Sequence, residues 1–104
     1  MGLDISIKTQ FNESVYENDF SGRQRWSWFV TFMEHEFDYK YAEDMPLTKK
    51  IIDRMINELL HHCKELDIFE DENELCENVR MIESLLICRG AIKSGYKATW
   101  EADW

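Results

Sequence analysis

Residues 96–104 read YKATWEADW and carry the clearest strand pattern in the chain. Apolar side chains alternate there with polar ones, the apolar set being Tyr96, Ala98, Trp100, Ala102 and Trp104. Because successive side chains of a strand point to opposite faces, this alternation predicts a half-buried strand.

The other end of the chain shows the same pattern. Residues 3–11 read LDISIKTQF. The odd-numbered positions form the inward-facing set, which comprises Leu3, Ile5, Ile7, Thr9 and Phe11. Both ends are therefore predicted to be strands of one sheet, as neighbours. Residues 13–17 are a candidate for a short third strand.

Three helices are predicted between these strands. The first begins at Ser21-Gly22, with Ser21 as its N-cap. Its inward face is predicted from apolar residues at helical spacing, namely Trp26, Phe29, Val30, Met33 and Phe37. A strand competes with this helix because WSWFVTF, residues 26–32, is rich in strand-forming residues.

The second helix is predicted from about Leu47 or Thr48 to Leu66, just after Pro46. Its broad apolar stripe contains Ile51, Ile52, Met55, Ile56, Leu59, Cys63 and Leu66. An acidic turn over residues 67–72 leads into the third helix. We expect that helix to end at Arg89-Gly90 and to turn Leu75, Val79, Ile82 and Leu86 inward.

These elements predict one compact α+β domain over residues 1–104. A small antiparallel sheet from the N- and C-terminal strands is covered by about three helices. A chain of 104 residues has the usual size of one domain. No apolar run approaches the roughly 18 residues of a membrane span, and the N-terminus has no signal-peptide pattern, so we expect no membrane association.

The cysteines and histidines indicate no cofactor. The chain has three cysteines, an odd number, and no CxxC pair occurs among Cys63, Cys76 and Cys88. This predicts free thiols in a cytoplasmic protein. His61-His62-Cys63 is the most metal-like cluster, but a helical wheel points the three side chains in different directions. We therefore predict no metal site. A metal- or thiol-dependent enzyme using these groups or His35 is the alternative.

No catalytic motif stands out elsewhere. The glycines form neither a phosphate-binding nor a dinucleotide-binding loop, and no serine lies on a recognisable nucleophile turn. The sequence favours a non-enzymatic protein, with no catalytic residue assigned.

The charge balance points to a basic partner. There are 21 acidic and 12 basic residues, so the net charge is −9. Like charge opposes direct binding to nucleic acid or anionic lipid. The candidate contact acids cluster at the start of the third helix: Glu70, Asp71, Glu72, Glu74 and Glu77. Such a cluster can mimic phosphates toward Arg and Lys, or can simply be a solvated turn that complements the helix dipole.

Two helices carry a second apolar stripe. On the first helix it comprises Trp28, Phe32 and Tyr39, and on the third Met81, Leu85 and Cys88. Such a stripe indicates either a helix packed on two sides or an exposed partner or dimer face. Trp28 and Phe32 are the candidate apolar anchors for a partner, and a homo-oligomer is possible.

Three features resemble small proteins of bacteriophages and prophages: the opening MGLDI, the segment YENDFSG (residues 16–22) with Trp26 four positions beyond the glycine, and a terminal strand that ends in Trp104. The resemblance covers about a third of the chain, which departs from that group in its more acidic central helices. It implies a phage or mobile-element setting and supplies no activity.

Together these observations predict a phage accessory protein in the host cytoplasm. It would bind and inhibit a host nucleic-acid-handling defence factor, as anti-CRISPR or anti-restriction proteins do, through an acidic and DNA-mimicking surface. The alternatives are the small enzyme above and a homo-oligomeric structural or regulatory subunit of a phage.

Overall fold

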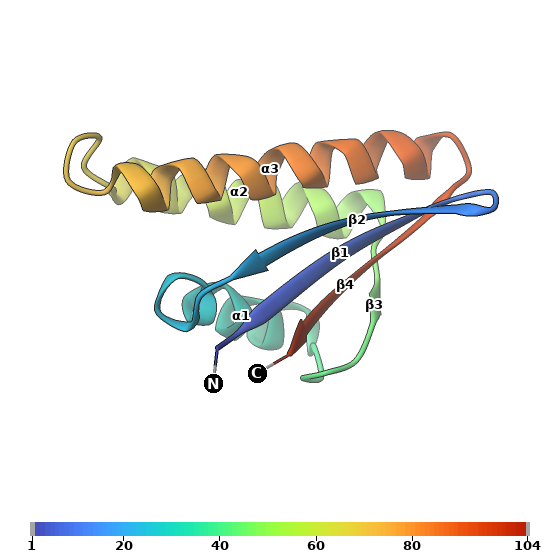
Figure 1. Cartoon of the computed structure of the whole chain (residues 1–104), viewed down its shortest axis with the longest axis horizontal. Coiled ribbons are helices and arrows are strands. Elements are labelled where there is room, and N and C mark those ends of the chain that lie inside the picture. Colours follow the sequence, from blue (N-terminus) through green and yellow to red (C-terminus); the bar gives the residue numbers. More distant parts are fainter. Residues whose placement is uncertain (1, 104) are drawn as a thin grey trace.

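The computed structural model describes residues 2–103, which form a four-stranded antiparallel sheet and three helices (Figure 1). Along the chain these are β1 (Asp4–Phe11), β2 (Ser14–Ser21), α1 (Arg23–Phe37), β3 (Met45–Pro46), α2 (Lys49–Glu65), α3 (Glu72–Lys93) and β4 (Lys97–Asp103). The predicted α+β class is confirmed. Trp104, predicted to lie in the last strand, falls outside the described residues.

The sheet has the order β2-β1-β4-β3, with every neighbouring pair antiparallel. The two terminal strands are neighbours, as predicted, and Ile7 of β1 lies opposite Trp100 of β4. β2 is longer than the expected short strand, because the hairpin at Asn12 pairs it with β1 along its whole length. Asn12 makes that tight turn with φ 53°, a conformation that asparagine tolerates well.

One face of the sheet carries the hydrophobic core. Ile5, Ile7 and Trp100 are fully buried or nearly so, against helix side chains that include Trp26 and Met33. The residues of opposite parity along β1 and β4 are partly or fully exposed. This division follows directly from the period-2 alternation of both strands.

Residues 23–37 form a helix, so the competing strand is wrong. The predicted inward face is correct for Trp26, Phe29, Val30 and Met33, which are all buried. Ser21 is not the N-cap, because it is the last residue of β2 and Gly22 occupies the cap position with φ 122°. Glycine adopts this conformation, which side chains disfavour, and lets the chain turn sharply from strand to helix.

α2 begins as predicted. The Thr48 hydroxyl accepts a hydrogen bond from the Ile51 amide at 3.2 Å, which satisfies one of the free donors of the first turn. Ile52, Met55 and Leu59 form its buried face. Among residues 2–103, none of the helices combines the length and the apolar character that crossing a bilayer requires.

The prediction for α3 was wrong in two respects. The helix continues past Gly90 to Lys93, and it buries Met81, Leu85 and Cys88, the stripe that had been assigned to a second face. Val79 and Leu86, predicted to point inward, are 43% and 52% exposed. Both stripes are apolar, so periodicity alone did not distinguish the face that packs on the domain.

Polar contacts of α3 show which neighbours select its buried face. Asn78 contacts His62 of α2, and Arg89 donates to Asp53 of the same helix at 2.7 Å. The thiol of Cys88 lies 3.2 Å from the hydroxyl of Thr9 on β1. Each contact requires the face that carries Met81 and Leu85 to point into the domain.

Candidate partner-binding surface

The turn between α2 and α3 presents the most exposed large apolar side chain among the described residues. Phe69 is 87% exposed and its neighbour Ile68 is 64% exposed. We call residues 67–72 the acidic turn, because four of the six are acidic. Figure 1 shows it as the yellow loop at one end of the helical layer, remote from the hairpin that joins β1 and β2.

Two carboxylates brace the acidic turn from within. Oδ1 of Asp67 accepts hydrogen bonds from the backbone amides of Phe69 and Glu70 at 2.8 and 2.9 Å. Oδ2 of Asp71 accepts one from the amide of Asp67 at 2.8 Å. The two amide donors lower the pKa of the Asp67 carboxyl, and the amide of Glu70 contributes more than that of Phe69. The backbone beneath Phe69 is thus held in one shape.

The five acids predicted to bind a partner differ in their surroundings. Glu70 and Glu72 are exposed on the acidic turn, whereas Asp71 is engaged in bracing it. Glu74 faces His62, with Oε1 3.7 Å from Nε2, and Glu77 pairs with Arg80 at 3.1 Å. Of the five, Glu70 and Glu72 are therefore the exposed acids close to Phe69 in the chain, while the other three make contacts within the domain. The helical repeat of α3 rotates Glu74 and Glu77 away from that pair.

The predicted apolar anchors are packed within the domain. The indole of Trp28 stacks on His62 with ring centroids 4.0 Å apart. Phe32 stacks on Phe29 and receives the guanidinium of Arg54 at 5.0 Å from its ring centroid. Both rings are partly buried against the core. Of the two interpretations of this stripe, the helix packed on two sides is the one that the structure supports.

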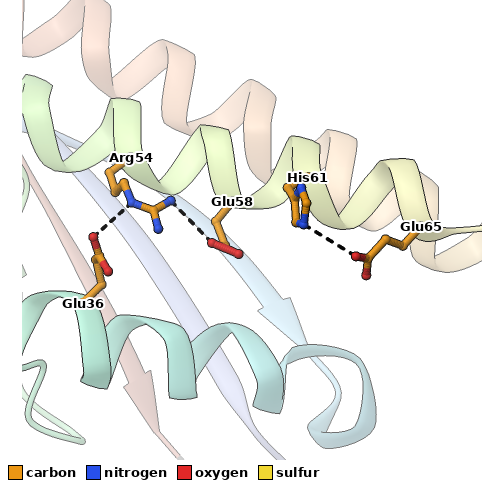
Figure 2. A network of polar contacts seen from close by, with 5 residues as sticks. All are labelled: Glu36, Arg54, Glu58, His61 and Glu65. Atoms are coloured by element: carbon orange, nitrogen blue, oxygen red, sulfur yellow. Dashed lines mark hydrogen bonds and ion pairs between the residues drawn. The ribbon is translucent and has the colours of Figure 1, made fainter.

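Figure 2 shows the charged side chains along α2 together with Glu36 of α1. Nε of Arg54 lies 3.0 Å from Glu36 of α1, and its Nη1 lies 3.4 Å from Glu58. One turn further on, His61 pairs with Glu65 at 3.5 Å. Glu36 and Glu58 hold Arg54 where its guanidinium can cover Phe32.

The histidines of the metal-like cluster have separate surroundings. His61 reaches only the exposed Glu65, while His62 lies between Trp28 and Asn78. Within residues 2–103, no three His, Cys, Asp or Glu side chains are placed to hold a metal ion together.

The outer face of the sheet is a second acidic surface, formed by residues that are far apart in the sequence. Asp4 lies directly opposite Asp103 across the β1–β4 pair, and Ser6 lies between Asp19 and Glu101. The pKa of Glu101 is raised, mainly by a carboxyl–carboxyl hydrogen bond with Asp44, then by desolvation and by the charge of Asp44. These acids come from both ends of the chain and from residue 44. In the two terminal strands, the polar residues that alternate with the buried apolar ones already indicated which acids lie on this face.

Comparison with protein-family models, with curated proteins and with solved structures found no match for this chain.

Proposed function

We propose that the protein binds a basic surface of a nucleic-acid-handling protein and blocks that surface against nucleic acid. The contact is the acidic turn, with Phe69 as its apolar anchor and Glu70 and Glu72 as flanking charges. The observation that carries this proposal is the 87% exposure of Phe69 on a turn braced by Asp67 and Asp71.

Protein interfaces concentrate their binding energy in a few central side chains, often aromatic, surrounded by polar groups that exclude water. Phe69 fits such a centre, because the rest of the domain neither buries nor requires its ring. The braced backbone lowers the entropy that would be lost on docking. Glu70 and Glu72 match the Arg and Lys side chains that otherwise grip phosphates.

The class of target is inferred from the net charge of the protein and from its resemblance to phage proteins. A net charge of −9 steers the protein toward strongly basic surfaces and away from nucleic acid itself. The resemblance to small phage and prophage proteins supports a host defence factor in the cytoplasm, such as a restriction enzyme or a CRISPR effector, as the target. The protein acts by occupying the nucleic-acid-binding surface of its target, as a DNA-mimicking inhibitor does, and needs no cofactor.

Affinity capture followed by a displacement assay tests this function. The tagged protein is incubated with nuclease-treated host lysate at low and high salt, and bound proteins are identified by mass spectrometry. The captured enzyme is then purified, loaded with fluorescent DNA and titrated with the protein. We expect salt-sensitive capture and release of the DNA in proportion to the bound protein.

Three matched variants locate the contact. Phe69→Ala is expected to weaken binding about 30-fold, the effect of losing an interface centre worth about 2 kcal/mol. Glu70→Lys/Glu72→Lys is expected to weaken it by a similar factor, because two attractive pairs become repulsive. Glu13→Lys/Glu34→Lys changes the net charge equally on exposed residues elsewhere and is expected to have a much smaller effect.

The reverse pattern would contradict the proposal in defined ways. Equal loss in the two charge-reversal variants would mean that only net charge matters. A fourth variant, Glu101→Lys/Asp103→Lys, tests the outer face of the sheet, and loss of binding in that variant alone would move the contact there. A captured enzyme that binds DNA and the protein at the same time would exclude a blocking mechanism.

A further inference from the structure

The outward face of α3 carries a seam of apolar residues that the domain covers only in part. Val79 and Leu86 are 43% and 52% exposed, although both are aliphatic and lie in the middle of the longest helix. Leu75 and Ile82 flank them and are partly buried. The spacing of these four residues alternates between four and three positions, which is the spacing of a coiled-coil seam. We call them the outer α3 stripe.

The charges at the two ends of this face are opposite. Glu72, Val79, Leu86 and Lys93 follow one another at intervals of seven residues. At about 100° per residue, a seven-residue step returns to nearly the same side of a helix. Each end of the seam therefore has one formal charge, negative at the start of α3 and positive at its end.

Gly90 lies on the same face and has no role in the packing of the domain. It is exposed, and a Cβ atom built there would have no neighbouring atom within 4 Å. Glycine destabilises a helix interior relative to alanine. A glycine at this position would be explained if a second helix packed closely against it, because the missing Cβ atom leaves room for that helix.

We propose that the outer α3 stripe docks against the same stripe of a second copy, with the two α3 helices antiparallel. The two-fold axis passes between residues 82 and 83. This register places Val79 against Leu86 of the second copy, and Ile82 beside its own symmetry mate. It also places Leu75 over Gly90 of the second copy, and Glu72 beside Lys93 of the second copy, so that a partner bound at Glu72 competes with this end contact.

The antiparallel direction follows from the charges. A parallel pair would bring Glu72 against Glu72 and Lys93 against Lys93, and it would leave the space above Gly90 unfilled. In the antiparallel pair both ends carry an attractive contact, repeated by symmetry as in any isologous interface. One repulsive contact remains, because Glu83 lies near its own symmetry mate on the rim.

Sedimentation equilibrium of the full chain, from micromolar to near-millimolar concentration in physiological salt, tests this interface. We expect a reversible dimer for the wild type. Leu86→Lys is expected to weaken it about 100-fold or more, because two lysines would be buried against Val79. The lysine is added where Leu86 is half exposed, so the monomer fold is retained, as circular dichroism will check.

A charge-exchange series tests the register. Glu72→Lys and Lys93→Glu are each expected to weaken the dimer about tenfold, because each creates two like-charge contacts. The double variant Glu72→Lys/Lys93→Glu restores the attraction and is expected to return close to wild-type affinity. Lys64→Glu, on the exposed side of α2, is the matched control and leaves the affinity within about twofold.

Glu83→Gln provides an independent gain of affinity, expected to be about threefold, since it removes the one repulsion near the axis. A wild-type chain that stays monomeric at the highest concentration would overturn the proposal. A dimer unaffected by Leu86→Lys would place the interface elsewhere and would also overturn it. A double charge exchange that fails to restore affinity would overturn the antiparallel register.

Discussion

Nδ2 of Asn78 lies 2.8 Å from Nδ1 of His62, which joins α3 to α2 at a point where Asn78 is fully buried. The imidazole nitrogen and the side-chain amide share this hydrogen bond, and which of them donates depends on the tautomer of His62. Nε2 of His62 faces Glu74 at 3.7 Å, and the indole of Trp28 stacks on the ring. One histidine thus brings α1, α2 and α3 together.

The Asn78–His62 contact gives a first prediction. Asn78→Ala removes the buried amide and leaves Nδ1 of His62 without this hydrogen bond, so we expect a loss of about 1–3 kcal/mol in the free energy of unfolding. Urea unfolding measures this loss. Asn57→Ala, an exposed asparagine on α2, is the control and is expected to change stability by less than about 0.5 kcal/mol. Equal effects of the two substitutions would show that the contact adds nothing.

Adjacent leucines on α3 provide a second prediction. Leu85 is fully buried and Leu86 is 52% exposed. Leu85→Ala is expected to cost about 2–5 kcal/mol through lost burial and a cavity. Leu86→Ala is expected to cost less than about 1 kcal/mol when measured at low concentration, where self-association does not contribute. Thermal unfolding of both variants decides the orientation of α3, and the reverse order would mean that the helix is rotated.

The Glu101–Asp44 pair predicts a pH dependence. The folded state binds the Glu101 proton more tightly than the unfolded chain, because the pKa of Glu101 is raised in the fold. Stability therefore falls as the pH rises through the window from the unfolded pKa of Glu101 to its folded pKa. Asp44→Asn is expected to lower that folded pKa and to stabilise the protein at neutral pH.

The gain from Asp44→Asn is expected to be below about 1 kcal/mol, because solvent screens partly exposed charges. It should disappear near pH 4, close to the ordinary pKa of a glutamate. NMR titration of the Glu101 carboxyl carbon and melting curves at both pH values measure the two effects. An unchanged titration midpoint in the variant would refute the coupling. Asp103→Asn, which removes a weaker influence on Glu101, serves as the comparison.

The three cysteines are expected to differ in reactivity. Cys76 is exposed, Cys63 is partly buried and Cys88 is buried. Burial also raises the pKa of the Cys88 thiol, so little of the reactive thiolate forms at neutral pH. With an aromatic disulfide reagent at low protein concentration, Cys76 should react first and Cys88 only on unfolding. Cys76→Ser should remove the fast phase, and a fast phase that persists would contradict this order.

The acidic surface shows what the sequence predicted of the candidate site and what it missed. Clustering of acids along the chain predicted Glu70 and Glu72 as contact residues, and both are exposed. The exposure of Phe69 is not predictable from the sequence, because a phenylalanine between two helices is equally consistent with a buried turn. Trp28 and Phe32 were chosen as anchors because their helical spacing was clear, but spacing does not reveal that His62 and Arg54 cover them.

The sequence by itself determined the α+β class, the pairing of the terminal strands and the existence of three helices. Period-2 alternation requires one buried sheet face, and the apolar stripe of α2 is compatible with only one orientation. Only the tertiary structure decided the face of α3, because that helix is apolar on both sides and either side satisfies its periodicity. Asn78, Cys88 and Arg89 find partners on α2 and β1 in one orientation alone. These contacts between distant segments accompany the burial of Met81 and Leu85, and they leave Val79 and Leu86 of the outer α3 stripe exposed to solvent.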